Sequence, residues 1–267
     1  MYCPRKLYIE RVLGISEIPK GAMVLGSVKH RVLDSFNSEE ANIVCAIKSV
    51  SSHGEISDSY KSCFSDILRR AIIKSRNQIK MAGLNPMDVF NEFSSFFEKE
   101  AESRARFISD FMKKHNLHGE SLWNKLSPKI KSEYKITSES LGISGKIDRI
   151  EIHEGFLIPV EMKTGTPPEE GAWESHKVQL AAYALLLEDN FKTNIPEGVV
   201  YYVDCGKRVQ VFINPFLKEQ VKELACSVNA LLVSKDIPPL VDNKNKCSAC
   251  NLREKCHGLV TEQKQNI

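Results

Sequence analysis

The sequence lacks any apolar run near the roughly 18 residues that a membrane-spanning helix requires, and it has no secretory signal pattern. We therefore expect a cytoplasmic protein with no membrane partner. In that reducing compartment its 8 cysteines are not expected to form disulfides. Proline- or glycine-rich linkers, internal repeats and low-complexity segments are also absent, so no flexible linker divides the 267 residues.

A strong excess of charge is lacking too, since the net charge of +3 is too small to establish a nucleic-acid partner. Basic residues do gather in one stretch around Trp123 and Tyr134, namely Lys99, Arg104, Arg106, Lys113, Lys114, Lys125, Lys129, Lys131 and Lys135. Such a stretch suits a channel for a single nucleic-acid strand, through phosphate attraction and base stacking. Because acidic residues are interspersed, a solvated helix face explains it nearly as well.

Two long helices are predicted, over about 60–81 and about 87–114. Gly83 can end the first helix, and Asn85 and Pro86 can cap and open the second. From their position alone we expect these helices to arch over a functional site as a lid.

Residues 143–152 and 156–162 are predicted to form two neighbouring strands. The first alternates imperfectly between apolar and polar residues, but it is rich in β-branched residues and free of proline. Gly155 can turn the chain between the two strands. Pro159 interrupts the second, mostly apolar run, which is tolerable at a sheet edge or a bulge.

Two carboxylates and a lysine on these strands form a candidate active site. Glu161 and Lys163 project to the same face of the second strand, where Asp148 on the first strand can meet them. Two carboxylates and a main-chain carbonyl suit Mg²⁺ or Mn²⁺, which prefer oxygen ligands. Lys163 would orient or help deprotonate an attacking water and offset phosphate charge. The pattern predicts metal-dependent cleavage of nucleic acid, and a surface hairpin with an ordinary Glu/Lys pair is the alternative.

A histidine and a glutamine–tyrosine pair extend the candidate site. His30 lies in a helical stretch that runs to about Phe36, and Gly26, one turn before it, would let the helix approach a metal closely. Gln179 and Tyr183 share one face of an apolar helix that follows the second strand, where buried polar groups need partners. The catalytic lysine or a DNA phosphate would supply those partners. Ordinary structural roles are the alternative for all of these side chains.

Cysteines near the C-terminus indicate a metal or cluster site. Cys247, Cys250 and Cys256 have the spacing of such sites and need a fourth ligand. His257 could complete a Cys₃His zinc site. Cys3, near the other end of the chain, would instead give four thiolates, which favour an iron–sulfur cluster. From the spacing alone, zinc and iron–sulfur are equally open.

Six short motifs occur in the order found in the RecB-like nucleases of the PD-(D/E)xK superfamily. They are Tyr2-Cys-Pro-Arg-Lys6, Gly26-x-x-x-His30, Gly145-x-x-Asp148-Arg149, Glu161-x-Lys163, Gln179-x-x-x-Tyr183 and Cys247-x₂-Cys250-x₅-Cys256. More narrowly, the sequence resembles the iron–sulfur exonuclease encoded with CRISPR systems, the fourth of the numbered CRISPR-associated proteins. The motifs lie at both ends and in the middle of the chain.

The resemblance implies a restriction-endonuclease-like α/β fold of the RecB type, with a mixed central sheet flanked by helices. It implies a nuclease domain over residues 1–236, with a helical insertion at about 55–130. A cysteine-cluster region over 237–267 would be closed by Cys3. Relatives usually have a short segment before the Tyr-Cys-Pro motif, so we expect either a start upstream of Met1 or the absence of a leading strand.

Ligands and catalytic groups are implied as well. The metal, Mn²⁺ or Mg²⁺, would be bound by His30, Asp148, Glu161 and the main-chain carbonyl of Met162. The catalytic residues would be Lys163, Asp148, Glu161, Gln179 and Tyr183. An iron–sulfur cluster, more often of the four-iron four-sulfur than of the two-iron two-sulfur type, would be held by Cys3, Cys247, Cys250 and Cys256. The resemblance therefore favours an iron–sulfur cluster over zinc, a choice that the cysteine spacing alone leaves open.

Members of this family degrade single-stranded DNA, often from the 5′ end, and some cut DNA internally. They are associated with the CRISPR integrase and trim new spacers. The resemblance therefore implies a metal-dependent DNA exonuclease of spacer acquisition, with single-stranded DNA and the integrase proteins as partners. The alternatives are a non-cleaving DNA-end-binding subunit of the integrase complex and a RecB-like repair nuclease outside CRISPR. Intact His30, Asp148, Glu161 and Lys163 argue against the non-cleaving alternative.

Overall fold

The computed structural model describes residues 3–16, 20–234 and 236–265, the last six of these by their backbone alone. Met1 and Tyr2, which open the first motif, lie outside the described residues. The chain divides into two compact units, a larger one of residues 20–218 and a smaller one of residues 1–19 with 219–267. This division differs from the domain boundary predicted between residues 236 and 237, which stays a prediction.

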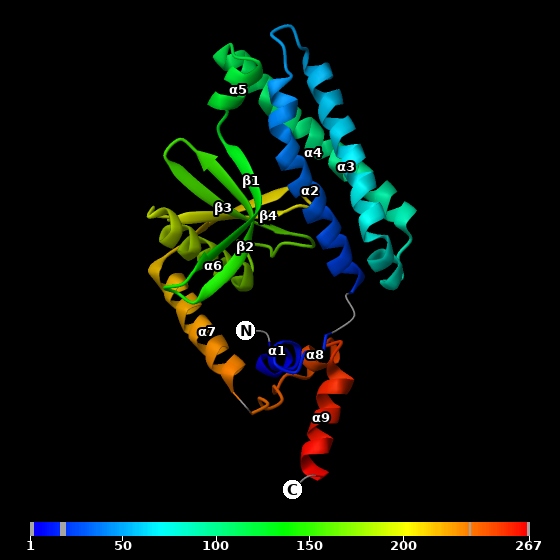
Figure 1. Ribbon diagram of the computed structural model, residues 1–267, viewed down its shortest axis with the longest axis vertical. Helices are drawn as coiled ribbons and strands as arrows, with labels where there is room; N and C mark the ends of the chain where they lie inside the picture. Colours follow the sequence, from blue (N-terminus) through cyan, green and yellow to red (C-terminus); the bar gives the residue numbers. More distant parts are fainter. Residues whose placement is uncertain (1–2, 17–19, 235, 266–267) are drawn as a thin grey trace. The chain divides into compact units, whose positions relative to one another are not determined.

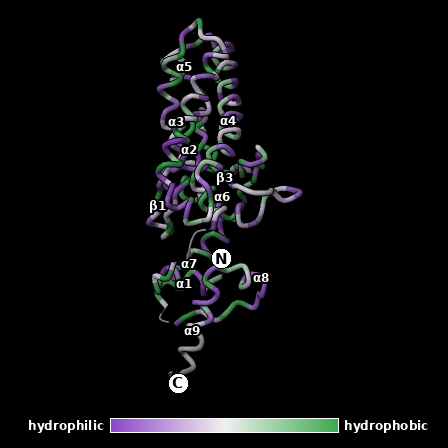
Figure 2. Tube along the Cα trace, turned by 90° about the vertical axis from the view of Figure 1, so that its right-hand side faces the viewer, coloured by the Kyte–Doolittle hydropathy of each residue, from purple (hydrophilic) through white to green (hydrophobic). Residues whose placement is uncertain are grey.

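The larger unit begins with a helical layer (Figure 1). Its helices are α2 Gly21–Cys45, α3 His53–Met81, α4 Pro86–His115 and the short α5 Gly119–Lys125. Stacked rings of Phe36, Phe64 and Phe97 join α2, α3 and α4 in one apolar core. In Figure 2 hydrophilic and hydrophobic residues alternate along these helices, as expected of helices that bury one face.

The ends of the two predicted helices are close to those observed. Asn85 caps α4 by accepting a hydrogen bond from the Met87 amide, and Pro86 opens the helix, as predicted. Helix α3 starts earlier than predicted because Ser52 and Glu55 form a reciprocal capping box at its N-terminus. Helix α2 also continues well beyond Phe36, to Cys45. These longer helices form a wall beside the sheet (Figure 1).

A five-stranded sheet follows the helices, in the order β1-β2-β3-β4-β5. Its strands are β1 Lys129–Ser138, β2 Ile143–His153, β3 Phe156–Lys163, β4 Glu197–Tyr202 and β5 Lys207–Phe212. Strands β3 and β4 are parallel, with helix α6 Glu174–Phe191 between them in the chain, and the other pairs are antiparallel. Val160 and Met162 of β3 join the core of α2–α4, whereas α6 contacts β1 to β4. The predicted mixed central sheet flanked by helices is confirmed.

The predicted edge or bulge position of Pro159 is wrong, because β3 lies in the middle of the sheet. Pro159 pairs with Ile150 of β2 in an unbroken register. On the other side of β3, a Cβ at Gly198 would lie 3.0 Å from the Pro159 carbonyl oxygen and 3.1 Å from Leu180. Glycine therefore permits the close approach of β4 to β3 at this point.

The smaller unit contains helix α1 Pro4–Arg11, most of α7 Pro215–Val233, α8 Lys244–Ser248 and α9 Arg253–Gln265. Arg5 is only 3% exposed and connects α1 to the C-terminal segment. Its guanidinium donates to the Pro238 carbonyl at 2.7 Å and to the Cys256 sulfur at 3.2 Å. Among the described helices of either unit, none combines the length and apolarity needed to cross a membrane.

Candidate active site

Three carboxylates occupy one row across β1, β2 and β3. Ser132 pairs with Arg149 and Tyr134 with Ile147 in the antiparallel register of β1 and β2, so Glu133 and Asp148 lie between these pairs at the same level of the two strands. The pairing of β2 with β3 ends at Arg149 and Val160. One residue further along each strand, Asp148 and Glu161 are again at the same level. Directly opposed side chains in an antiparallel pair stand next to one another. The sheet thus gathers three acidic side chains that are far apart in the sequence.

Strands β2 and β3 separate where this row crosses them. Their pairing ends at Arg149 and Val160, and the Asp148 carboxylate then accepts a hydrogen bond from the Met162 amide at 2.9 Å. The N–H and C=O of an extended residue point to the same side of the strand. The Met162 carbonyl therefore faces the opening on the Asp148 side, which is where a ligand oxygen would be needed.

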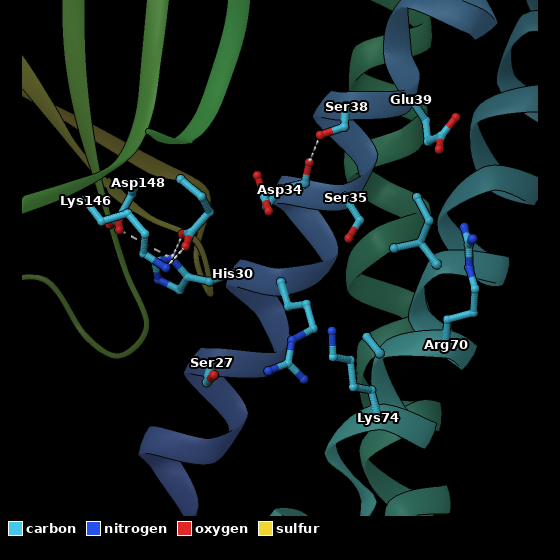
Figure 3. Close-up of a pocket in the computed structure, with 14 residues that line it drawn as sticks. Ser27, His30, Asp34, Ser35, Ser38, Glu39, Arg70, Lys74, Lys146 and Asp148 are labelled. Atoms are coloured by element: carbon cyan, nitrogen blue, oxygen red, sulfur yellow. Dashed lines mark hydrogen bonds and ion pairs between the residues drawn. The ribbon is translucent and has the colours of Figure 1, made fainter. Parts of the chain in front are cut away.

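His30 of α2 reaches the same place from the helical layer (Figure 3). Its Nδ1 lies 3.6 Å from an oxygen of Glu133 and 3.6 Å from an oxygen of Asp148. Possible ligand atoms of these three residues all lie within 4.8 Å of one another. Burial works to lower the pKa of His30, but the neighbouring carboxylates Glu133, Asp148 and Glu161 outweigh it and raise that pKa. The site therefore attracts positive charge.

Two contacts hold α2 close to the end of β3. A Cβ at Gly26 would meet the Thr164 hydroxyl oxygen at 3.6 Å, so the helix passes directly beside the residue that follows Lys163. Lys29 forms an ion pair with Asp204, whose other oxygen accepts a hydrogen bond from the Gly165 amide at 2.7 Å. These contacts fix the position from which His30 approaches the sheet.

Glu161 has the environment of a cation ligand. It is 1% exposed, and its Oε2 is buried and accepts no hydrogen bond from the residues that the structure describes. Burial and the charge of Asp148 raise the pKa of this carboxyl, against the opposing effect of Lys163. A buried carboxylate oxygen without a hydrogen bond is costly, and so is the repulsion between two carboxylates; a divalent cation between Glu161 and Asp148 would relieve both costs. The oxygen-rich donor set with one imidazole fits Mn²⁺ or Mg²⁺.

Lys163 belongs to a chain of polar contacts that ends in the sheet backbone. Its ammonium lies 2.5 Å from Glu161 and donates to the Gln179 side-chain oxygen at 3.0 Å. The Gln179 amide donates to the Tyr183 hydroxyl at 3.1 Å, which donates to the Lys146 carbonyl at 3.1 Å. The lysine is thus the partner of Gln179, which is half-buried and not fully buried, and is one of the two partners expected. The chain of contacts holds the lysine in one orientation beside Glu161.

Glu133 is the site residue that the sequence reasoning missed. Its backbone is left-handed, with φ of 49°, although glycine is the residue that usually adopts this conformation. The side chain forms an ion pair with Lys146, and its hydrogen bond to His30 lowers its pKa. A strained backbone at a cluster of charged groups is typical of a functional position.

In the smaller unit, Cys3, Cys247, Cys250 and Cys256 line one small cavity together with His257. The Cys256 sulfur accepts the hydrogen bond from Arg5, which helps to orient it. Among the described residues, no three cysteine sulfurs lie all within 4.8 Å of one another. A tetrahedral zinc site with Zn–S bonds of about 2.3 Å would hold its sulfurs about 3.8 Å apart. Four cysteines around one cavity supply the donor set of a structural zinc ion or an iron–sulfur cluster.

Comparisons with known proteins agree with this geometry. Residues 1–257 match the family model described as PD-(D/E)XK nuclease superfamily. A CRISPR-associated exonuclease Cas4/endonuclease Cas1 fusion of Leptospira interrogans is 36% identical over 149 residues, 52% of this chain and 27% of the relative. A CRISPR-associated exonuclease Cas4 of Rhodospirillum rubrum is 32% identical over 123 residues, 45% of this chain and 37% of the relative.

A third relative matches almost the whole chain. It is the DNA replication ATP-dependent helicase/nuclease JHS1 of Arabidopsis thaliana, 24% identical over 271 residues, which is 95% of this chain and 19% of the relative. The matches cover only about a fifth to two fifths of these three relatives' own lengths. Since the family model spans nearly all of the sequence, this chain belongs to the PD-(D/E)XK nuclease superfamily.

Proposed function

We propose that this protein is a metal-dependent DNA exonuclease that degrades single-stranded DNA, chiefly from the 5′ end, with some internal cleavage. It would act in the cytoplasm in CRISPR spacer acquisition, beside the integrase proteins. The observation that carries the proposal is the convergence of Asp148, Glu133 and His30 next to the ion pair between the buried Glu161 and the half-buried Lys163. The names of the CRISPR-associated relatives, one group of which is fused to an endonuclease Cas1, support the biological setting.

In this proposal the metal ligands are His30, Asp148, Glu161 and the Met162 carbonyl, with Glu133 added by the geometry. Mn²⁺ or Mg²⁺ held there would supply Lewis-acid stabilisation of the charge that develops on the phosphate during cleavage. The Asp148 carboxylate accepts a hydrogen bond from the Met162 amide, and this contact fixes the orientation of the Met162 carbonyl.

Lys163 is the proposed catalytic group that does not bind the metal. Its ammonium, held between Glu161 and Gln179, would orient the attacking water and offset negative charge on the phosphate. Gln179 and Tyr183 act as positioning residues, because they fix the lysine through hydrogen bonds that end at a backbone carbonyl. A lysine free to rotate would lose much of this effect.

The cysteine cavity is proposed to hold an iron–sulfur cluster, with the four-iron type favoured over the two-iron type. The shared cavity of the four cysteines and the hydrogen bond from Arg5 to the Cys256 sulfur support a group held by cysteine sulfurs. Its role would be structural, because Cys3 comes from the N-terminal part of the chain and Cys247, Cys250 and Cys256 from the C-terminal part.

A second candidate function is a replication or repair nuclease outside CRISPR. The helicase/nuclease relative is aligned over 95% of this chain, whereas the 2 CRISPR-associated relatives described above align over 52% and 45% of it. The chemistry of the site would be the same, so the two candidates differ in partners and not in mechanism.

Digestion of end-labelled DNA tests the proposal. Anaerobically purified protein is incubated with single- or double-stranded DNA labelled at the 5′ or 3′ end, with Mn²⁺, Mg²⁺ or a chelator. We expect cleavage only with metal, faster on single strands, and release of the 5′ label first. Lys163→Ala should slow cleavage by about 10²–10⁴-fold. The control Lys177→Ala removes an ion pair with Glu174 within α6 and should leave the cleavage rate unchanged. Full activity of Lys163→Ala, or cleavage in chelator, would contradict the mechanism.

A further inference from the structure

A cavity of about 770 Å³ adjoins the candidate metal site. His30, Glu133, Lys146 and Asp148 lie on its sheet side, and the facing helices α2 and α3 supply the rest of its lining. Figure 3 shows Arg70 and Lys74 on the α3 side of this space, across from His30. The volume falls within the roughly 300–1,000 Å³ of pockets that enclose a small organic ligand. A few nucleotides of a single strand fit such a space, and a duplex does not.

Basic residues form the α3 wall of the cavity. Ile67, Arg70, Ala71 and Lys74 line it at the three- and four-residue steps of one helix face. Arg70 and Lys74 are exposed, and neither makes an ion pair or hydrogen bond with any residue that the structure describes. Two like charges one helical turn apart repel each other. Their unpaired positive charge is therefore directed at an anion that enters the cavity.

Arg31 adds a third cation to the same cavity from α2. Its guanidinium donates to the hydroxyl of Ser75, which lies next to Lys74 on α3. This hydrogen bond holds the arginine across the gap between the two helices. The two helices thus contribute three cations to the cavity, and Lys146 of β2, which is paired with Glu133, is a fourth on the sheet side.

The acidic residues of the cavity lie mostly with the metal site. Burial and the charge of Glu133 raise the pKa of Asp34, which places Asp34 in the electrostatic neighbourhood of the carboxylate row. Glu39, the other acidic lining residue on α2, accepts a hydrogen bond from Asn42. The cavity thus has an acidic side, suited to a divalent cation, and a basic side on α3.

We propose that this cavity binds the segment of single-stranded DNA next to the scissile phosphate, with Arg31, Arg70 and Lys74 contacting its backbone phosphates. The inference rests on the proposed nuclease function and adds the path of the substrate. Point charges on phosphates carry no base information, so the binding is independent of sequence. None of the basic residues of the 99–135 stretch lines the cavity, and Arg104 of that stretch is bound to Glu40 instead.

The salt dependence of DNA binding tests this assignment. Binding of a fluorescein-labelled oligothymidylate is measured by anisotropy over a range of salt concentrations, in the Lys163→Ala background and with chelator present, so that the DNA is not cleaved during the measurement. Arg70→Gln with Lys74→Gln is compared with Arg69→Gln plus Arg76→Gln, which removes the same charge from exposed positions of α3 outside the cavity. All four positions are exposed, so both double variants should fold, which circular dichroism checks.

We expect the Arg70/Lys74 variant to bind more weakly and its plot of log K against log salt to be shallower by about 1.4, since each single-strand phosphate contact contributes about 0.7. The Arg69/Arg76 variant should keep the slope of the background protein. Equal slopes for the two double variants would overturn the assignment of the cavity. Cleavage by the wild-type protein, measured in parallel, separates the two claims: if it cleaves DNA while the slopes are equal, only the strand path is wrong, and if it neither binds nor cleaves, the proposed function fails.

Discussion

Replacing Glu133 by glutamine tests the site residue that no sequence motif marks. The change keeps the size of the side chain and removes one negative charge from a group whose oxygen lies 3.6 Å from His30 Nδ1. The other ligands, Asp148 and Glu161, are left in place. If Glu133 helps to hold the divalent cation, Glu133→Gln should weaken metal binding without unfolding the protein.

The expected size of the effect follows from linkage. Removing a group that supports a metal ligand typically costs about 10–100-fold in affinity, and each factor of ten is about 1.4 kcal/mol. At metal concentrations well above both dissociation constants, the stabilisation by metal falls by the same amount. For a unit of this size, about 1 kcal/mol corresponds to a shift of about 2–4 °C in Tm. Glu133→Gln should therefore lose about 3–11 °C of the metal-induced rise in Tm.

Thermal unfolding with Mn²⁺ or Mg²⁺, against a chelator baseline, measures this loss. Glu154→Gln is the matched control, because Glu154 is a carboxylate in the exposed turn after β2, with a side chain 77% exposed. It should leave the metal-induced shift unchanged. A metal-induced shift in Glu133→Gln equal to that of the wild type, together with full cleavage activity, would refute a role for Glu133 in the metal site.

Two further substitutions test the core and the cysteine cavity. Glu40→Ala should lower the free energy of unfolding, measured by urea titration, by about 3–5 kcal/mol. The reason is that the buried Glu40 carboxylate pairs with Arg104 and accepts a hydrogen bond from the Tyr60 hydroxyl at 3.0 Å. Glu39→Ala, at an exposed neighbour, is the control, and a loss below about 1 kcal/mol for Glu40→Ala would contradict the expectation. Cys250→Ala should remove the visible absorbance of the cluster and lower the stability of the smaller unit, whereas Cys226→Ala, an exposed cysteine of that unit, should do neither. A Cys250→Ala protein that remains coloured and stable would rule out the cluster assignment.

Local patterns were sufficient for the central strands and the helix behind them. Alternation over residues 143–152 and the run over 156–162 predicted β2 and β3, and the spacing of Gln179 and Tyr183 predicted that both side chains lie on one helix face. These are properties of neighbours in the sequence, so they need no knowledge of the fold. The edge position of Pro159 was wrong because strand order depends on the crossover through α6, which local pattern does not report.

Strand β1 and its Glu133 were missed although a signal is present. Residues 129–136 alternate strictly, with charged residues at odd positions and Ile130, Ser132, Tyr134 and Ile136 at even ones. That pattern predicts a strand, but the charges were interpreted as part of a nucleic-acid-binding stretch. A hairpin between this strand and residues 143–152 would have set Glu133 at the same level as Asp148. The approach of His30 is different, because it depends on how α2 packs: the Gly26–His30 spacing only permits it, and the family resemblance implies which metal site it joins.

The cation site is shared between two layers of the larger unit, since His30 comes from α2 and the carboxylates come from the sheet. Binding of the ion and docking of α2 against the strands are therefore thermodynamically coupled. If docking of the helix strengthens ion binding, then ion binding strengthens docking by the same free energy. Removing the contacts of Asp204 with Lys29 and Gly165 would weaken the docking of α2, and with it ion binding, while every ligand side chain stays in place. Under the proposed function, catalytic competence is therefore a property of helix placement as much as of the acidic residues.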